Sequence, residues 1–353
     1  MKTVMYKLPQ DADKAYTAAA KTLKNGGLVA FPTETVYGLG GNALDPAASK
    51  KIYAAKGRPS DNPLIVHIAE KESLYELVME VPEKAKKLMD RFWPGPLTII
   101  LKKNDTVPLE TTGGLDTVAV RMPDHEVALE MIRACGLPIA APSANTSGRP
   151  SPTKAAHVAE DLAGKIDIIL DGGDVGIGVE STIIDLSGEP CILRPGYITK
   201  DDLEAVIGSV AIDPALENIQ SGRLPAGDFK PKAPGMKYRH YAPKAPLTLV
   251  TGSRQEAKET LLKLLAKAKA EGKRCAVICE FYKDFEGKAD VIYALGSRDD
   301  TLSISRQIYD VLRDTDRQNV DAIFADDFGL DSDEHFGYAV QNRLMKAAGG
   351  KLL

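Results

Sequence analysis

Disulfide, metal and membrane chemistry have little support in this 353-residue sequence. The chain has four cysteines, which are too few and too scattered for a disulfide framework, and we expect buried thiols at Cys135, Cys191, Cys275 and Cys279. The five histidines include no HExxH or similar pair, so no protein-built metal site is expected. No run approaches the roughly 18 apolar residues of a membrane span, and the N-terminus lacks a signal-peptide core. We therefore predict a cytoplasmic protein with no membrane partner.

Neither sign of charge dominates the sequence. Lysine and arginine number 45 against 49 aspartates and glutamates, and the formal net charge is -4. This balance argues against a protein whose main task is to grip a phosphate backbone, so any contact with tRNA should be weak and local. The 44% hydrophobic and 27% charged residues are ordinary for a globular protein, and the length favours two domains.

Apolar periodicity divides the chain into three parts. Residues 1–208 alternate short β-rich runs with helical stretches such as 47–55 and 82–92, which predicts an α/β domain around a substantial sheet. The seven β-rich runs are LVAFPT, LIVHI, LTIIL, TVAVRM, PIAAPS, IDIIL and STIIDL. Residues 209–246 are proline-rich and lack apolar periodicity, which is typical of a linker. In residues 247–353 strands alternate with long helices, which predicts a small, mostly parallel, Rossmann-like sheet. The first strand there is followed by TGSRQE and not by G-x-G-x-x-G, so no dinucleotide site is expected.

Two loops combine cations, hydroxyls and turn residues. In KGRPSDNP, residues 56–63, Lys56 offers a point charge and Arg58 a bidentate fork to phosphate oxygens, on a turn stiffened by proline. Taken alone, a solvated basic turn is the more ordinary interpretation. The segment APSANTSGRPS, residues 141–151, offers hydroxyls, an amide and backbone donors that suit a phosphate or a carboxylate. It also fits an ordinary Ser/Gly/Pro loop.

Three further features point to small polar ligands. In FPTETVYGLGG, residues 31–41, we expect a strand that leads into a glycine-rich turn. The glycines permit close backbone approach to a ligand, and the threonines can bond a polar head or cap a helix. Arg194 suits a phosphate or ribose contact or a surface ion pair, and Arg121, at the end of an expected strand, suits a carboxylate. No Walker sequence and no G-x-S-x-G elbow occurs, so P-loop and triad chemistry are excluded.

Together these segments resemble the YrdC-like threonylcarbamoyl-AMP synthases in their long form, over essentially the whole chain. The most specific match is the split signature K-x-R and S-x-N, which makes the expected catalytic set Lys56, Arg58, Ser143 and Asn145. FPTETVYGLG, LRPG and PGMKYRHYAP also match. The resemblance implies a twisted mixed-sheet α/β domain with a smaller C-terminal Rossmann-like domain. It implies a nucleotidyltransferase that joins L-threonine, bicarbonate or CO2, and ATP into threonylcarbamoyl-AMP and pyrophosphate.

The resemblance also assigns residues to each substrate. Those expected around threonine are Thr35, His67, Arg121, Ala141 and Ser181, with Arg121 on the carboxylate. Those expected around ATP are Lys56, Arg58, Asn62, Thr117, Ser143, Asn145, Ser151 and Arg194. Mg²⁺ is expected mainly on the ATP phosphates, and a partner transferase complex is expected to use the adenylate to modify the adenosine beside the anticodon of tRNAs. No residue stands out as a general base.

The linker matches the long form as well, in which it is thought to lie across the catalytic cleft. Tyr238, Arg239 and His240 are therefore candidates for a lid that shields a labile carbamate from water, while a plain spacer is the alternative from composition. Two other functions compete with the synthase. One is a double-stranded RNA or tRNA binding module, which the acidic balance disfavours. The other is a carbamoyl transfer domain of hydrogenase maturation, whose acylphosphatase and zinc-finger segments are missing here.

Overall fold

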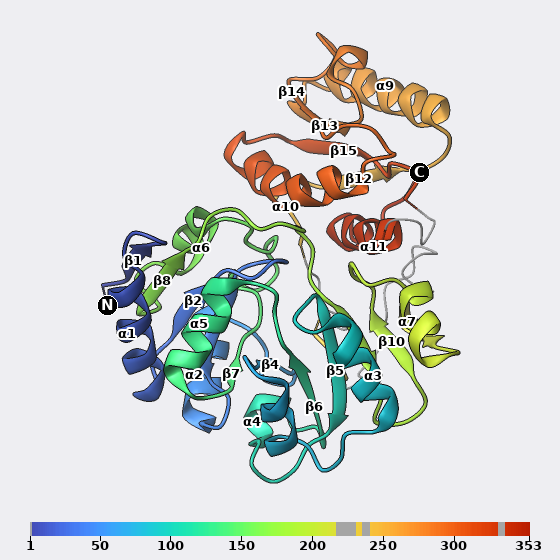
Figure 1. The fold of residues 1–353 in the computed structure, drawn as a ribbon. Helices are drawn as coiled ribbons and strands as arrows, with labels where there is room; N and C mark the ends of the chain where they lie inside the picture. Colours follow the sequence, from blue (N-terminus) through green and yellow to red (C-terminus); the bar gives the residue numbers. More distant parts are fainter. Residues whose placement is uncertain (1, 217–230, 235–240, 331–335) are drawn as a thin grey trace. The chain divides into compact units, whose positions relative to one another are not determined.

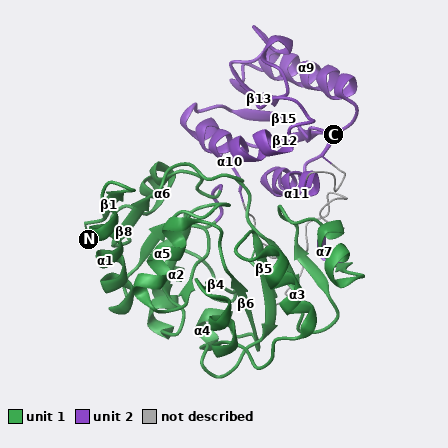
Figure 2. Ribbon diagram, viewed as in Figure 1, with its two compact units in different colours: residues 1–147, 151–213, 227–237 green, residues 148–150, 214–226, 238–353 purple. Residues whose placement is uncertain are grey.

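The computed structural model of the chain consists of two compact units. It describes residues 2–216, 231–234, 241–330 and 336–353. The first unit comprises residues 1–147, 151–213 and 227–237, and the second comprises residues 148–150, 214–226 and 238–353 (Figure 2).

The first unit is built on one mixed sheet (Figure 1). Within the described residues this sheet has eleven strands in the order β1-β8-β2-β3-β7-β4-β6-β5-β9-β10-β11. They are β1 (Val4–Lys7), β2 (Val29–Phe31), β3 (Gly38–Asn42), β4 (Ile65–His67), β5 (Leu97–Lys102), β6 (Thr117–Arg121), β7 (Ile139–Ala140), β8 (Ile168–Asp171), β9 (Thr182–Asp185), β10 (Cys191–Arg194) and β11 (Ala211–Ile212). Parallel pairs such as β4 with β6 stand beside antiparallel pairs such as β5 with β6. The predicted mixed α/β domain is confirmed.

Short helices connect these strands and cover the sheet. They are α1 (Ala12–Lys24), α2 (Pro46–Lys56), η1, a 3-10 helix (Lys71–Glu76), α3 (Glu83–Phe92), α4 (Leu109–Thr112), α5 (Glu126–Cys135), α6 (Ala155–Leu162) and α7 (Lys200–Ile207). Helices α1 and α5 contribute Leu23 and Met131 to a core that also holds Phe31 of β2 and Leu170 of β8. Burying such large apolar side chains stabilises the fold by about 1.5–3 kcal/mol each.

The strand and helix predictions hold where the apolar pattern is strong. All seven β-rich runs of the first domain contain a strand, and the expected helices at 47–55 and 82–92 are α2 and α3. The segment 38–41 was expected to be a glycine-rich turn but lies in β3. Glycine has a low strand propensity, and the hydrogen bonds of β3 with β2 and β7 outweigh it here. Nine described elements of this unit had no stated counterpart: strands β1, β10 and β11, the 3-10 helix η1, and helices α1, α4, α5, α6 and α7.

The second unit has a small parallel sheet in the order β12-β15-β13-β14. Its strands are β12 (Leu247–Val250), β13 (Cys275–Cys279), β14 (Val291–Ala294) and β15 (Ala322–Asp326), and its helices are α9 (Arg254–Ala270), η2 (Tyr282–Asp284), α10 (Thr301–Arg317) and α11 (Gly337–Ala347). Figure 2 shows α9 on one face of the sheet and α10 and α11 on the other. Leu261 and Leu265 of α9 pack with Val277 and Phe324 in the core. This confirms the predicted parallel, helix-flanked domain.

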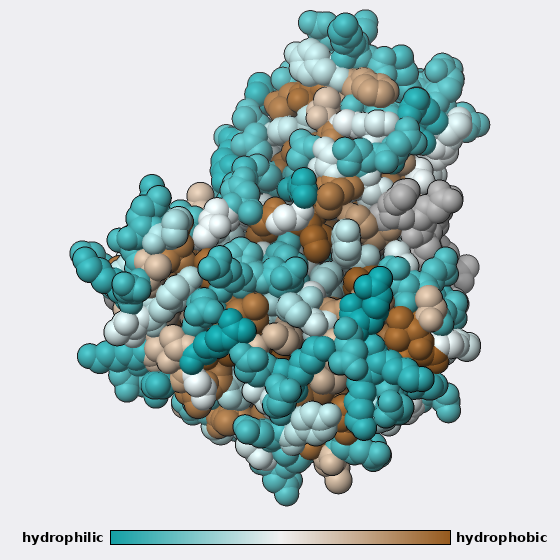
Figure 3. All heavy atoms as spheres, viewed as in Figure 1, coloured by the Kyte–Doolittle hydropathy of each residue, from teal (hydrophilic) through white to brown (hydrophobic). Residues whose placement is uncertain are grey.

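The surface and the cysteines fit the composition. On the face seen in Figure 3 hydrophilic side chains dominate, and hydrophobic ones form smaller groups. Cys135, Cys275 and Cys279 are buried free thiols as expected, whereas Cys191 is only half-buried. Burial raises the pKa of the Cys279 thiol to about 12, so this thiol stays protonated at neutral pH. Within the described ranges, no helix combines the length and the hydrophobicity that a membrane span needs.

Candidate functional site

Lys56 joins the two halves of the split signature. It is the last residue of α2, which ends because Gly57 adopts the left-handed conformation at φ 62°. The Lys56 side chain is only 2% exposed. Its ammonium donates to the backbone carbonyl of Ser143 and, at 2.6 Å, to that of Asn145. A buried cation held by two carbonyls fixes the 143–145 loop against the end of α2.

Local hydrogen bonds shape the second half of the signature. The Ser143 hydroxyl donates to the Asn145 side-chain oxygen at 2.5 Å, and the Asn145 amide donates to the Thr146 carbonyl at 2.9 Å. The Ser147 backbone N–H donates to the Lys56 carbonyl at 2.8 Å. The structure therefore brings Lys56, Ser143 and Asn145 together from positions that are almost 90 residues apart.

Arg58 braces the turn that leads into β4. Its guanidinium donates to the backbone carbonyls of Asn62, at 3.3 Å, and Pro63, at 3.1 Å. Asn62 is itself buried, and within the described residues its side-chain oxygen accepts no hydrogen bond. Because a buried amide oxygen without a partner is costly, Asn62 marks a position where a donor from a ligand would be favourable.

Arg121 lies at the centre of a second group of buried polar residues. Its guanidinium donates to the Thr35 hydroxyl at 3.0 Å and to the Gly95 carbonyl at 3.3 Å. A third nitrogen of the guanidinium lies 2.6 Å from a carboxylate oxygen of Glu34. Both Thr35 and Glu34 belong to the loop between β2 and β3, so Arg121 ties that loop to the end of β6.

His67 sits at the end of β4, beside Arg121 in the β4–β6 register. Burial, and then the positive charge of Arg121, lowers the pKa of His67 from 6.5 to about 3, so the imidazole is neutral at pH 7. The Phe31 ring packs edge-on against it, with centroids 6.0 Å apart. A side chain at Gly40 would come within 2.9 Å of the Phe31 ring. The glycine at this position of β3 thus makes room for the Ile139 and Phe31 side chains.

Ser181 and Arg194 form a third group, where β9 begins and β10 ends. Arg194 donates to the Ser181 carbonyl and to its hydroxyl, both at 3.0 Å, and the Thr98 hydroxyl lies 2.8 Å from that hydroxyl. All three side chains are buried. The backbone of Gly196 passes so close that an added Cβ would lie 2.2 Å from the Thr182 nitrogen. In LRPG, therefore, Gly196 is needed for close packing, and Arg194 is the candidate ligand contact.

The remaining expected residues occupy defined places along the strands. The Ala141 N–H donates to the Ile65 carbonyl at 2.8 Å, which places Ala141 beside β4. The Ser151 hydroxyl donates to the buried Glu180 carboxylate at 2.6 Å. Thr117 begins β6 and Arg121 ends it, and the four residue steps between them span about 13 Å. The expected ATP and threonine residues on β6 are thus at opposite ends of one strand.

Sequence reasoning missed three polar residues of the site: the largely shielded Glu34 and the buried Thr98 and Glu180. No local pattern marks the two carboxylates, because Glu34 stands between Thr33 and Thr35, and Glu180 stands between Val179 and Ser181. Only their tertiary contacts single them out.

Residues 231–234 of the linker belong to the first unit. Ala233 is fully buried in a cluster with Ile65, Ala119 and Ile183. Side chains two residues apart on a strand share a face, so Ala233 covers the sheet face that also carries His67, two residues beyond Ile65. The predicted lid residues Tyr238, Arg239 and His240 lie outside the described residues.

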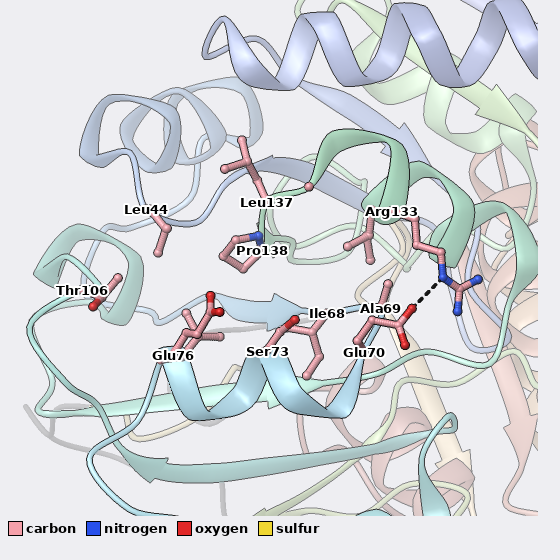
Figure 4. A pocket seen from close by; sticks show the side chains of 13 residues that line it. Leu44, Ile68, Ala69, Glu70, Ser73, Glu76, Thr106, Arg133, Leu137 and Pro138 are labelled. Atoms are coloured by element: carbon pink, nitrogen blue, oxygen red, sulfur yellow. Dashed lines mark hydrogen bonds and ion pairs between the residues drawn. The ribbon is translucent and has the colours of Figure 1, made fainter.

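A cavity of about 380 Å³ opens in the first unit near the end of β4 (Figure 4). Ile68, Glu70, Ser73 and Leu137 are among its lining residues, and Glu70 pairs with Arg133 at 2.8 Å. None of the expected site residues lines it, so the cavity is separate from the site described above. The part of the chain that the structure describes holds no group of three or more His, Cys, Asp or Glu side chains that could bind a metal ion.

Known proteins resemble the chain over its whole length. A family described as "Telomere recombination" matches residues 21–196, and one described as "Threonylcarbamoyl-AMP synthase, C-terminal domain" matches residues 198–349. The threonylcarbamoyl-AMP synthase of Pyrococcus abyssi is 51% identical over 95% of this chain and 94% of its own. That of Bacillus subtilis is 50% identical over 97% and 95%.

Solved structures give the same result. The crystal structure of P. abyssi Sua5 complexed with L-threonine has a TM-score of 0.91 and 48% identity to this chain. The match covers 99% of each chain.

Proposed function

This chain belongs to the threonylcarbamoyl-AMP synthase family, and we propose that it makes threonylcarbamoyl-AMP from L-threonine, bicarbonate or CO2, and ATP. The observation that carries the proposal is the Lys56 ammonium, which joins both halves of the family signature in one buried site. The similarity of 50% or more to two synthases over nearly the full chain supports the same reaction. This reaction is a nucleotidyl transfer, and it is the first step of threonylcarbamoyl-adenosine formation in tRNA.

The reaction has two bond-forming steps. The threonine nitrogen bonds to CO2 and gives a carbamate. A carbamate oxygen then attacks the α-phosphorus of ATP, the bond from that phosphorus to its bridging oxygen breaks, and pyrophosphate departs in line. Such a phosphoryl transfer depends mainly on positioning and on the neutralisation of developing charge.

Arg121 and Thr35 would hold the threonine. The guanidinium is buried and cationic, which suits a carboxylate, and the Thr35 hydroxyl beside it suits a polar group of the amino acid. His67, Ala141 and Ser181 would complete the threonine contacts. The neutral imidazole of His67 adds no second positive charge, so His67 would contribute a hydrogen bond and shape.

The signature residues would face the nucleotide. Lys56 and Arg58 bring two cations to loops at the same end of β4, which supports a role in offsetting phosphate charge. Ser143 and Asn145 would position the phosphates. The other ATP contacts in the proposal are Asn62, Thr117, Ser151 and Arg194. The separation of about 13 Å between Thr117 and Arg121 leaves length for a nucleotide and an amino acid to meet along the strand.

We propose that Mg²⁺ enters with ATP and is held mainly by the phosphate oxygens. This ion keeps several waters and few protein ligands in such sites, and the described residues offer no cluster that would bind it alone. When bound, it would neutralise part of the phosphate charge. Lys56 and Arg58 would offset part of the remaining charge, and the other residues would orient the nucleotide.

The proposal also covers the parts of the chain. Residues 1–208 would form the catalytic domain, 209–246 a linker with Tyr238, Arg239 and His240 as a lid, and 247–353 a second domain. The buried Ala233 supports the lid, because it brings the chain to the sheet face of His67 five residues before the first lid residue. A tRNA-modifying transferase complex would receive the adenylate, and direct contact with tRNA would be weak.

One assay tests the function. The pure protein is incubated with ATP, Mg²⁺, bicarbonate and one amino acid at a time, and pyrophosphate and the acyl-adenylate are measured. We expect release that requires both threonine and bicarbonate, with the adenylate formed in equal amount. Release without threonine, or none with it, would overturn the assignment.

A further inference from the structure

An amino acid must lose a proton from its ammonium group before it can form a carbamate. The residue that takes this proton is inferred on the basis of the proposed function. At neutral pH the amino group of threonine is an ammonium, which has no electron pair with which to bond CO2. A positioned base within hydrogen-bond reach of that proton raises the rate of such a transfer by typically 10²–10⁴-fold. None of the residues already assigned to threonine is an anion, and His67, which is neutral at pH 7, cannot attract the ammonium by charge.

Glu34 has the properties that such a base requires. Its side chain is 12% exposed and lies in the loop between β2 and β3, next to Thr35. Both carboxylate oxygens are shielded from solvent; one of them lies 2.6 Å from the Arg121 guanidinium, and the other has no hydrogen-bond partner among the described residues. A carboxylate offers about four acceptor positions, and leaving most of them unused in a shielded place is costly. Such a group indicates a ligand that brings N–H donors.

The pair of Glu34 and Arg121 matches the two charges of an amino acid. The Arg121 guanidinium lies 2.6 Å from the Glu34 carboxylate, so a cation and an anion stand side by side in one buried site. A zwitterion presents a carboxylate and an ammonium in a similarly short span. The carboxylate would bind Arg121 and the ammonium would bind Glu34, so each half of the ligand meets its opposite charge.

The surroundings of Glu34 hold its backbone in place. The Ile177 N–H donates to the Glu34 carbonyl at 2.8 Å, and the Gly178 N–H donates to the Thr35 carbonyl at 3.1 Å. Besides Arg121, the titratable group that faces the carboxylate is His125, just before α5.

The acidic neighbours on these elements point elsewhere. Asp124 and Glu126 are exposed, and Asp174 is exposed and lies 3.8 Å from Lys154. None of them competes with Glu34 for the ammonium.

We propose that Glu34 binds the α-ammonium of threonine and accepts its proton. The nitrogen then uses the freed electron pair to bond the carbon of CO2, and its second proton passes to a bicarbonate ion, which becomes CO2 and water. Overall, the ammonium, one bicarbonate and the Glu34 carboxylate give the carbamate, one water and the protonated Glu34. Glu34 returns its proton to water before the next cycle.

The test compares Glu34→Gln, Glu34→Asp and the matched control Glu189→Gln, in which an exposed glutamate is changed. Threonine-dependent pyrophosphate release is measured from pH 6.5 to 9.5, and each rate is divided by the wild-type rate at the same pH, which cancels the change in bicarbonate. We expect Glu34→Gln to lose about 100-fold at pH 7. The deficit should shrink as pH rises, since more threonine arrives as the free amine.

Glu34→Asp should keep part of the activity and the wild-type pH profile, because it keeps the carboxylate. A Glu34→Gln deficit that stays constant across pH would mean a structural role and would overturn the proposal, as would activity within twofold of wild type. If Glu34→Gln does not fold, a Glu34→Asp profile that rises with pH relative to wild type overturns it equally. A wild-type protein without threonine-dependent release would instead refute the proposed function.

Discussion

Replacing Lys56 by methionine should damage both the stability and the catalysis of this protein. Methionine keeps an unbranched chain of similar length but has no N–H to give to the carbonyls of Ser143 and Asn145. Hydrogen bonds to a charged group contribute about 1.5–3 kcal/mol each, so the two bonds set an upper limit of roughly 6 kcal/mol. Methionine also removes the cost of burying a cation, and the expected net loss in the free energy of unfolding is about 2–4 kcal/mol.

The loss in activity should exceed what instability alone causes. Without its tether the 143–145 loop no longer holds the Ser143 hydroxyl in place, and a loosened electrostatic site costs about 10²–10³-fold in rate. Pyrophosphate release is therefore measured at a temperature where denaturant titration shows the variant to be folded. The expected change is a fall in kcat together with a rise in the KM for ATP.

The control lies on the same helix. Lys50→Met makes the same substitution at an exposed lysine of α2, whose ammonium is 3.3 Å from the Glu110 carboxylate. An exposed pair of this kind contributes about 0–1 kcal/mol, so this variant should keep its activity and nearly all of its stability. If Lys56→Met kept kcat within threefold of wild type, or lost no more stability than Lys50→Met, the Lys56 hydrogen bonds to the 143–145 loop would not be needed for catalysis or stability.

Three further outcomes follow from the site. Thr35→Val removes the hydroxyl that accepts from Arg121, so the KM for threonine should rise about 10-fold while that for ATP stays constant in steady-state kinetics. Because burial lowers the folded pKa of His67 from 6.5 to about 3, the unfolded chain binds one more proton between these values. The free energy of unfolding should therefore fall as pH drops from 6.5 to about 3, by up to about 1.4 kcal/mol per pH unit. Urea titrations of His67→Gln should lack this contribution to the pH dependence. If Arg239 belongs to a lid, Arg239→Ala should release pyrophosphate but yield less intact adenylate, and equal yields would refute the lid.

Local sequence determined which chemistry this protein can carry. The apolar runs predicted the strands that became β4, β5, β6 and β9, because an uninterrupted apolar stretch bounded by turn residues is stable mainly as a buried strand. The split signature then supplied Lys56, Arg58, Ser143 and Asn145 as one set, although it did so by resemblance and not by periodicity.

Only the tertiary structure decided how those residues meet. Lys56 and Ser143 are 87 positions apart, and their contact depends on β7 lying between β3 and β4, a pairing that no local pattern encodes. The sequence predicted a turn at the glycines of β3, whereas the structure shows that Gly38 and Gly40 pack against the Phe31 ring. Glu34 lies between two threonines and carries no local signal. It became a candidate because the fold brings it against Arg121, which ends a strand almost 90 residues later. Residue types fix the available charges and donors, whereas long-range strand pairing fixes which of them share one buried site.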